Sequence, residues 1–125
     1  MIRWFGKAAV GFALVPAPSA LAHHSFAMFD GENQITIRGT VIEYKFANPH
    51  AFILFMAKDD KGGETSWSLE GASAASLTRD GWNGRTLKTG DELIMKISPL
   101  RSGAPGGAWE TKDTTLPDGK PVVNR

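Results

Sequence analysis

The sequence of 125 residues contains no cysteine. This excludes disulfide bridges, haem attachment through C-x-x-C-H, thiolate-held iron–sulfur clusters and blue-copper sites. The sequence also lacks a P-loop, a dinucleotide-binding fingerprint and an H-E-x-x-H motif, so we expect no nucleotide cofactor. The stretch from Gly71 to Ala75 begins like a nucleophile elbow but lacks its final glycine. No recognisable catalytic motif remains, which disfavours an enzyme.

An excess of charge of one sign is also missing. The chain has 14 Lys and Arg residues against 13 Asp and Glu residues, and the two signs alternate along it. Binding to a phosphate backbone depends on a strong local excess of Lys and Arg. Nucleic acid is therefore not an expected partner.

Long hydrophobic runs are absent as well, because the apolar run of residues 8–15 is too short to span a bilayer and no second run follows it. Basic residues precede this run, and Ala20-Leu21-Ala22 matches the A-x-A pattern of a cleavage site. We therefore predict that residues 1–22 are a secretory signal peptide and that the mature chain begins at His23. The expected location is the periplasm or the exterior, with no permanent membrane span.

Alternating apolar and β-branched residues predict strands, which are expected over 34–46, 51–58, 65–70, 92–98 and 108–114. The apolar positions of the first run change phase after Gly39, which predicts a bulge or a bend. Between the third and fourth strands, Ser73 as N-cap, Leu77 as buried contact and Gly81 past the end predict a helix. This order predicts an all-β chain with one short helix, a small OB-fold-like five-stranded antiparallel barrel. Another small antiparallel barrel or sandwich would give a similar pattern.

The predicted organisation has four parts along the chain. A signal peptide (1–22) is followed by an N-terminal histidine segment (23–33), an OB-like β-barrel domain (34–120) and a polar tail (121–125). In an OB-fold, the loop between the first two strands and the loop between the last two rim the usual binding face.

Two of the three histidines directly follow the predicted cleavage site. After cleavage, His23 would offer both its α-amine and its ring nitrogen to one metal ion, and a further imidazole would complete a histidine brace. Such nitrogen donors suit copper or zinc, and three of them in a T-shape fit tetragonal Cu(II) best. His50 is the distant imidazole, in a turn that Pro49 restricts. We predict a copper or zinc site formed by His23, His24 and His50.

Weaker candidates and plainer readings accompany this site. The Met28 thioether would suit Cu(I). Glu70 would interact with a helix N-terminus or form an outer-shell hydrogen bond to a metal-binding histidine. Alternatively, the adjacent histidines form a mobile polar tail, His50 only stabilises its turn, and Glu70 is a solvated charge. Cleavage one residue earlier would place Ala22 first, and the resulting Ala-His-His start would bind Cu(II) without His50.

Three further residues are candidates for a ligand-binding face: Trp82, Trp109 and Arg101. The plainer role of both tryptophans is to plug an end of the barrel. Two other functions therefore stand beside metal binding or delivery. One is a metal-free interaction module that holds a periplasmic protein, a peptide, a glycan or a small ligand. The other is a copper-dependent oxidative enzyme, because a histidine brace also activates oxygen species.

Several short motifs occur together in this chain: His23-His24-Ser25-Phe26, Phe29-Asp30, Gly39-Thr40-Val41, Asn48-Pro49-His50, Trp67 followed by Glu70, Leu77 with Gly81-Trp82, and Gly90-Asp91. With these motifs the chain resembles a family of small exported bacterial proteins of unknown function. The resemblance implies export and a compact β-rich domain over essentially the whole mature chain, apart from the C-terminal tail. It assigns no activity or substrate, although all three histidines fall inside its motifs.

Overall fold

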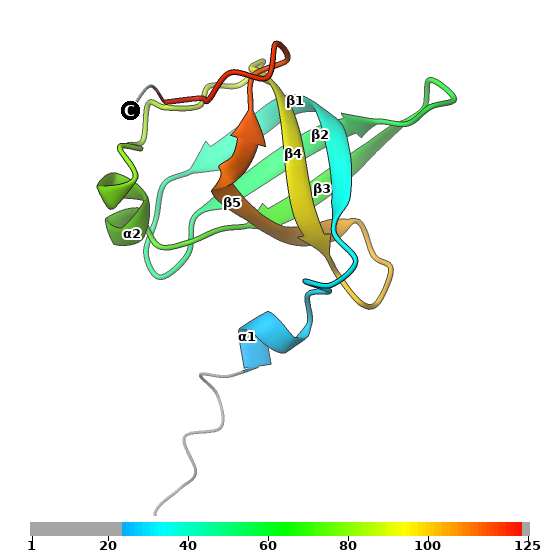
Figure 1. Ribbon diagram of the computed structural model, residues 1–125, viewed down its shortest axis with the longest axis horizontal. Coiled ribbons are helices and arrows are strands. Elements are labelled where there is room, and N and C mark those ends of the chain that lie inside the picture. The colour runs from blue at the N-terminus through cyan, green and yellow to red at the C-terminus, as the bar shows by residue number, and fades with distance from the viewer. Residues whose placement is uncertain (1–23, 124–125) are drawn as a thin grey trace, which may run out of the picture.

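The computed structural model describes residues 24–123, whose strands close into a single barrel (Figure 1). The elements are α1 (His24–Ala27), β1 (Ile35–Lys45), β2 (Phe52–Lys58), β3 (Glu64–Glu70), α2 (Ala74–Arg79), β4 (Glu92–Pro99) and β5 (Gly106–Thr115). The order around the barrel is β1-β2-β3-β5-β4, and β4 pairs back onto β1. The predicted five-stranded, mostly β barrel is confirmed. The single turn α1 is an addition that the sequence patterns do not predict.

The long strand β1 pairs with two neighbours, β2 and β4, and Gly39 lies where both pairings meet. It is opposite Ala57 on one side and Leu93 on the other. A Cβ atom at this position would overlap the carbonyl oxygen of Met56, so only glycine fits there. Just beyond it the register with β2 shifts between Val41 and Glu43, as at a β-bulge. The bend predicted after Gly39 is therefore confirmed.

A parallel pair, β3 with β5, closes the barrel. Ser68, Leu69 and Glu70 lie opposite Gly106, Gly107 and Ala108, whereas the other neighbouring strands pair antiparallel. β5 begins two residues earlier than predicted, because its two glycines allow close approach of the neighbouring backbones. A Cβ atom on Gly107 would lie 2.8 Å from the carbonyl oxygen of Ser98. The barrel is thus antiparallel except at this closure.

The core fills the barrel from alternate strand positions. The predicted inward face of β4 is confirmed, since Leu93 is 1% exposed and Met95 and Ile97 are fully buried. Ile35 shares a face with Ile37 but lies at the strand end, where it is 38% exposed. The remaining large core residues are Val41, Ile53, Phe55, Leu69, Leu77, Trp82, Leu87 and Trp109. Burial of this apolar set is the main source of stability in a domain without disulfides.

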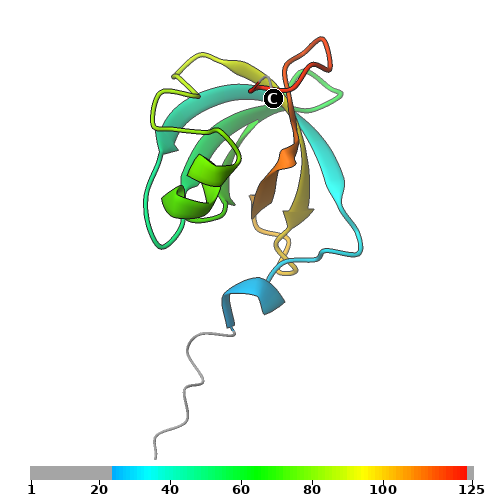
Figure 2. The same ribbon diagram turned by 60° about the vertical axis from the view of Figure 1, so that its left-hand side comes forward.

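Helix α2 lies beside the loop between β1 and β2 (Figure 2). Its predicted boundaries are confirmed: the Ser73 side chain accepts a hydrogen bond from the Ser76 N–H at 3.1 Å, and Gly81 beyond the end has a φ of +83°. Leu77 anchors the helix in the core at 1% exposure. Glycine is the usual residue at a position with positive φ directly after the last turn of a helix.

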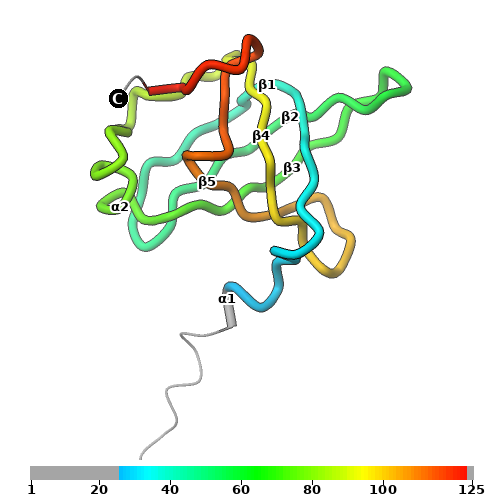
Figure 3. The backbone as a smooth tube through the Cα atoms, in the orientation of Figure 1, coloured from blue at the N-terminus to red at the C-terminus, as the bar shows by residue number. Residues whose placement is uncertain are grey.

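The C-terminal end of the described chain differs from the predicted polar tail. At the C-terminal end, Pro121 forms an isolated bridge with Thr115, and Val122 and Val123 pack against the core. The predicted polar tail therefore contributes apolar contacts as far as Val123. Figure 3 shows this end of the chain running toward the segment that follows α2. The predicted signal peptide, 1–22, lies outside the described residues. Within residues 24–123, no helix is long and apolar enough to cross a membrane.

Tyr44, the only tyrosine, provides a test of the barrel packing. Its hydroxyl is buried without a partner among the described residues, and this burial raises its pKa to about 12, because ionisation would place a charge in an apolar setting. We expect the tyrosinate absorbance to titrate with a midpoint of about 12, in place of roughly 10 for a solvated tyrosine.

Since the folded-state pKa is the higher one, the stabilisation by neutral Tyr44 should be complete below pH ~10 and disappear as pH rises through the folded pKa. Tyr44→Phe should remove this part of the alkaline loss of stability, measured by urea unfolding at several pH values. An ordinary titration midpoint would contradict the buried hydroxyl.

Candidate functional site

A groove of about 730 Å³ lies where the N-terminal segment, the β1–β2 loop and α2 meet. Its lining comes from five parts of the chain: Phe26, Phe29 and Gly31; Pro49 and His50; Glu70–Ser73; Ser76, Leu77 and Asp80; and Ser98 with 108–111. The β1–β2 loop therefore rims the groove as predicted. In place of the predicted β4–β5 loop, the other rim is the N-terminal segment.

His50 is held by one ring nitrogen. Its Nδ1 lies 3.2 Å from the carbonyl oxygen of Gly71 and 3.5 Å from Oε1 of Glu70. Because both neighbours are hydrogen-bond acceptors, the arrangement favours a proton on Nδ1. In the neutral imidazole the free electron pair then lies on Nε2. The structure thus brings Glu70 next to His50, as the predicted outer-shell role requires. The presence of a metal in this pair stays a prediction.

Backbone hydrogen bonds fix the His50 turn against the chain that follows β3. The Gly71 N–H donates to the Ala51 carbonyl at 2.8 Å, and the Ala51 N–H donates to the Ala72 carbonyl at 2.9 Å. On the other side of the turn, the Asn48 side chain accepts a hydrogen bond from the Ala75 N–H at 3.2 Å. Both ends of the turn are therefore tied down, which keeps the imidazole at the groove.

The structure describes the other predicted metal ligands only in part. His23 lies outside the described residues, and His24 is described only as the first residue of α1. Met28 is 47% exposed and is not part of the groove lining. Within residues 24–123, no group of three or more His, Asp or Glu side chains is close enough to hold a metal ion.

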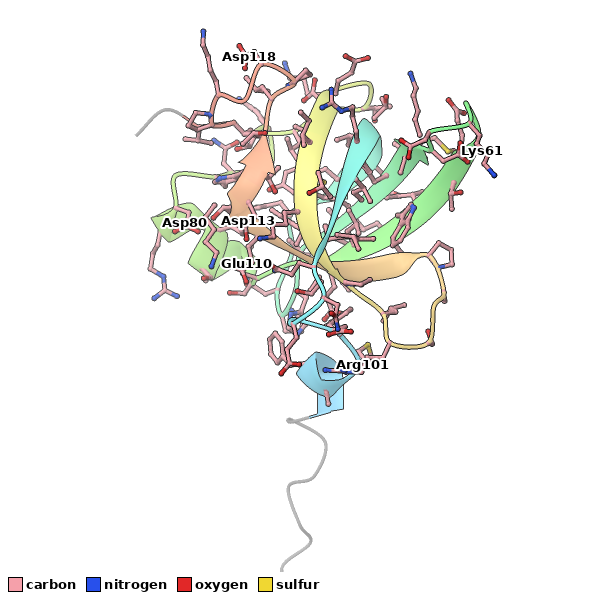
Figure 4. The ribbon with its side chains drawn as sticks, turned by 45° about the vertical axis from the view of Figure 1, so that its right-hand side comes forward. Lys61, Asp80, Arg101, Glu110, Asp113 and Asp118 are labelled. Carbon is pink, nitrogen blue, oxygen red and sulfur yellow. The ribbon has the colours of Figure 1, made fainter. Side chains whose placement is uncertain are left out.

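Arg101 binds the N-terminal segment and does not line the groove. Its Nε donates to the Ala27 carbonyl at 3.2 Å, and its backbone N–H donates to the Met28 carbonyl at 2.9 Å. Its Nη1 also lies 3.8 Å from Oδ1 of Asp30. In the structure Arg101 holds residues 27–30 against the β4–β5 loop (Figure 4), and its role as a ligand contact stays a prediction.

Asp30 fixes the turn that leads from this segment into β1. Its carboxylate accepts hydrogen bonds from the Asn33 side chain at 2.9 Å and from the backbone N–H groups of Asn33 and Glu32 at 3.2 Å. The side-chain bond from Asn33, followed by its backbone bond, lowers the pKa of Asp30 below its usual value. The carboxylate therefore stays ionised as a turn anchor.

Both candidate tryptophans are buried. Trp82 is 3% exposed and Trp109 is 2% exposed, with ring centroids 5.5 Å apart. Both candidates for a ligand-binding face thus lie in the core, which agrees with their plainer predicted role of plugging an end of the barrel. Of the two, only Trp109 belongs to the groove lining, where its indole lies directly against Gly71. Its Nε1 is buried without a hydrogen-bond partner among the described residues.

The sequence analysis does not predict two acidic residues of the groove lining, Asp80 and Glu110. Oδ2 of Asp80 accepts a hydrogen bond from the Thr111 hydroxyl at 2.8 Å, and Oε2 of Glu110 lies 2.9 Å from Nζ of Lys112. The Glu110 hydrogen bond and the charges of Glu110 and Asp113 raise the pKa of Lys112. No local signal marks these carboxylates, because Asp80 reaches Thr111, the residue after Glu110, only when the end of α2 lies against β5 (Figure 4).

Comparison with known proteins gives a family and no function. The model of a family of unknown function, DUF6152, matches residues 13–110. No curated protein and no solved structure matches the chain significantly.

Gly71→Ala tests how tightly the groove wall is packed. An added Cβ would lie 2.5 Å from Cε2 and 2.6 Å from Nε1 of Trp109, so the indole must move. We expect a loss of about 1–3 kcal/mol in the free energy of unfolding and altered tryptophan fluorescence. The matched control is Gly84→Ala, where the Cβ would meet Phe46 at an ordinary 3.7 Å. Equal stability of both variants in urea unfolding would show that Trp109 is not fixed against Gly71.

Proposed function

The chain belongs to this family, whose model covers most of its length, and since the family assigns no activity, we propose from the geometry around His50 that the protein captures and delivers a copper or zinc ion. The proposed ligands are His23, with its α-amine and ring, together with His24 and His50. The proposed setting is the periplasm, after removal of residues 1–22. Imidazole and amine nitrogens are donors that both ions accept.

The arrangement at His50 is the observation that carries this proposal. Metal-binding histidines characteristically donate their second ring N–H to a carboxylate or a backbone carbonyl, which fixes the tautomer and orients the ring. His50 has both kinds of acceptor at Nδ1, the Gly71 carbonyl and the Glu70 carboxylate. Within the described residues, Nε2 forms no hydrogen bond, so its electron pair is available to a metal.

The course of the N-terminal segment supports the same proposal. Phe26 and Phe29, shortly after the predicted histidine ligands, line the same groove as His50. The contacts of Arg101 with Ala27 and Met28 hold the chain between these two phenylalanines. Phe26 and Phe29 of the described chain therefore share a groove with the imidazole that the proposal requires.

Protons and metal ions compete for the same electron pairs in such a site. A protonated imidazole has no free pair at Nε2, and a protonated α-amine is likewise no ligand. Metal affinity should therefore fall as the pH decreases through the range in which histidines take up protons. A decrease in pH would therefore release the metal ion, which is the step that delivery requires.

His50→Ala is the direct test. Untagged protein purified after export is titrated with Cu(II) and examined by native mass spectrometry and calorimetry. We expect a chain that starts at His23 and holds one copper ion, with affinity reduced by roughly tenfold or more in His50→Ala and about tenfold in Glu70→Gln. Glu64→Gln, an exposed carboxylate on the same strand, serves as the control. Unchanged affinity in His50→Ala would remove His50 from the site, as would a chain that starts at Ala22 and binds copper as well without His50.

Arg101→Ala tests the contribution of the N-terminal segment. Loss of the guanidinium removes its bond to the Ala27 carbonyl and its contact with Asp30, so the segment is held less firmly at the groove. We expect a several-fold loss of Cu(II) affinity, because a looser segment adds an ordering cost on binding. Arg38→Ala, an exposed residue on β1, is the control. Equal Cu(II) affinity in the two variants would contradict the proposed role of the segment.

A further inference from the structure

We propose that the outer face of the sheet formed by β1, β2 and β3 binds a second copy of this chain, in a weak dimer with two-fold symmetry. We call this surface the β2 face. Its members are Thr40, Glu43, Lys45, Phe52, Leu54, Met56, Ser66, Ser68 and Glu70. The inference concerns assembly of the protein and does not depend on the metal proposal.

Strand β2 is apolar on both of its sides. Ile53 and Phe55 point into the barrel and are fully buried. Because side chains alternate along a strand, Phe52, Leu54 and Met56 point outward. Phe52 is 40% exposed, and the other two are half-buried. The outer surface of β2 therefore presents a continuous apolar row, and exposed apolar patches are typical of contact sites.

Polar residues of the two neighbouring strands border this apolar row (Figure 1). Residues that pair across adjacent strands project to the same side of a sheet. Phe52 pairs with Lys45 of β1 and with Glu70 of β3. The next two rows are Glu43, Leu54 and Ser68, and then Thr40, Met56 and Ser66. An apolar centre with a polar rim is the usual anatomy of a protein interface.

The order of charges across the rows selects a second copy as the partner. A two-fold axis between the copies, parallel to β2, lays β1 of one copy over β3 of the other and places Leu54 against Leu54 of the partner subunit. Lys45 then meets Glu70 of the partner subunit, and symmetry repeats this contact. Glu43 meets Ser68 of the partner subunit, so no like charges face each other in the three rows. An axis perpendicular to the strands would instead oppose Glu43 and Glu43 of the partner subunit, which is unfavourable.

Both charged groups of the proposed contact are accessible. Nζ of Lys45 lies 3.6 Å from Oε1 of Glu43, with side chains 63% and 55% exposed, and exposed pairs of this kind contribute little to stability. The ammonium group therefore moves to another carboxylate at little cost. Oε1 of Glu70 lies 3.5 Å from Nδ1 of His50, and the Glu70 side chain remains 23% exposed. Part of its carboxylate thus stays at the surface of the β2 face.

The shape and size of the β2 face indicate a weak contact. A hollow of about 240 Å³ lies between Lys45, Phe52, Leu54 and Ser68, and apolar side chains of the partner subunit gain contacts inside it. Three rows on three strands cover roughly 15 Å by 20 Å at the usual spacings. This is small for a specific interface, so the dimer should be transient, with a dissociation constant of the order of 100 μM.

Sedimentation of the untagged, chelator-treated protein at concentrations up to about 1 mM tests the dimer. We expect a reversible equilibrium between monomer and dimer. Phe52→Thr should raise the dissociation constant by roughly tenfold or more, because it removes the aromatic anchor of the face. The matched control is Ile35→Thr, which removes a large apolar side chain of similar exposure, 38% against 40%, outside the β2 face. This control should dimerise like the unmodified protein.

Charge reversal tests the orientation of the two copies. Lys45→Glu and Glu70→Lys each place like charges opposite each other, so each variant alone should dimerise roughly tenfold more weakly. When the two variants are mixed, opposite charges meet again at both contacts. The mixed pair should therefore associate several-fold more tightly than either variant alone. Lys96→Glu reverses an exposed lysine of β4, outside the β2 face, and is the control for Lys45→Glu.

A protein that stays monomeric over the whole concentration range would overturn the proposal. Equal dissociation constants for Phe52→Thr and Ile35→Thr would do the same, and this comparison does not depend on the folding of Glu70→Lys. Mixing that restores no association would rule out the two-fold arrangement. A dimer that forms only when Cu(II) is added would contradict the proposal in favour of a metal-bridged pair. Copper affinity is measured separately, so failure of the metal site is distinguishable from failure of the dimer.

Discussion

The barrel depends on one close approach of backbones, at Gly39. Here β1 is paired with β2 on one side and β4 on the other, and Met56 leaves no space for a Cβ atom. The bulge that follows bends β1, so one strand serves both sides of the barrel. A barrel closed in this way has no long unpaired edge at β1, because both sides of this strand are paired.

The groove follows from this closure through strand register. The antiparallel pairing of β2 with β3 places Phe52 opposite Glu70, which brings the turn just before Phe52, with His50, next to Glu70 and Gly71. The parallel pairing of β3 with β5 then places Glu70 opposite Ala108, next to Trp109. Residues far apart in the sequence thus meet at one end of the barrel, and α2 adds the remaining wall.

Local sequence patterns predict strands, caps and bends, but the groove is lined by residues from five separate parts of the chain. The alternation in β4, the Ser73 cap and the bend after Gly39 are visible in the sequence because each depends on a few neighbouring residues. The contact of Glu70 with His50 agrees with the predicted outer-shell role of Glu70, which rests on the chemistry of metal-binding histidines. The parallel β3–β5 closure leaves no such sign. Without it, nothing predicts that Asp80 and Glu110 join Glu70, or that Arg101 holds the N-terminal segment.

This end of the barrel differs in composition from a purely apolar barrel end, and the proposed metal site is built on that difference. A small domain without disulfides gains most from apolar packing. Yet this end keeps a partly buried Glu70 beside His50 and a buried indole N–H without a partner, and both features oppose folding. Natural sequences satisfy local and global preferences together except where function requires otherwise. Gly71 belongs to the same pattern, because it brings the Trp109 indole against the groove wall while adding no side chain of its own. Glu70 and His50 are therefore the polar groups from which the proposed metal site is argued.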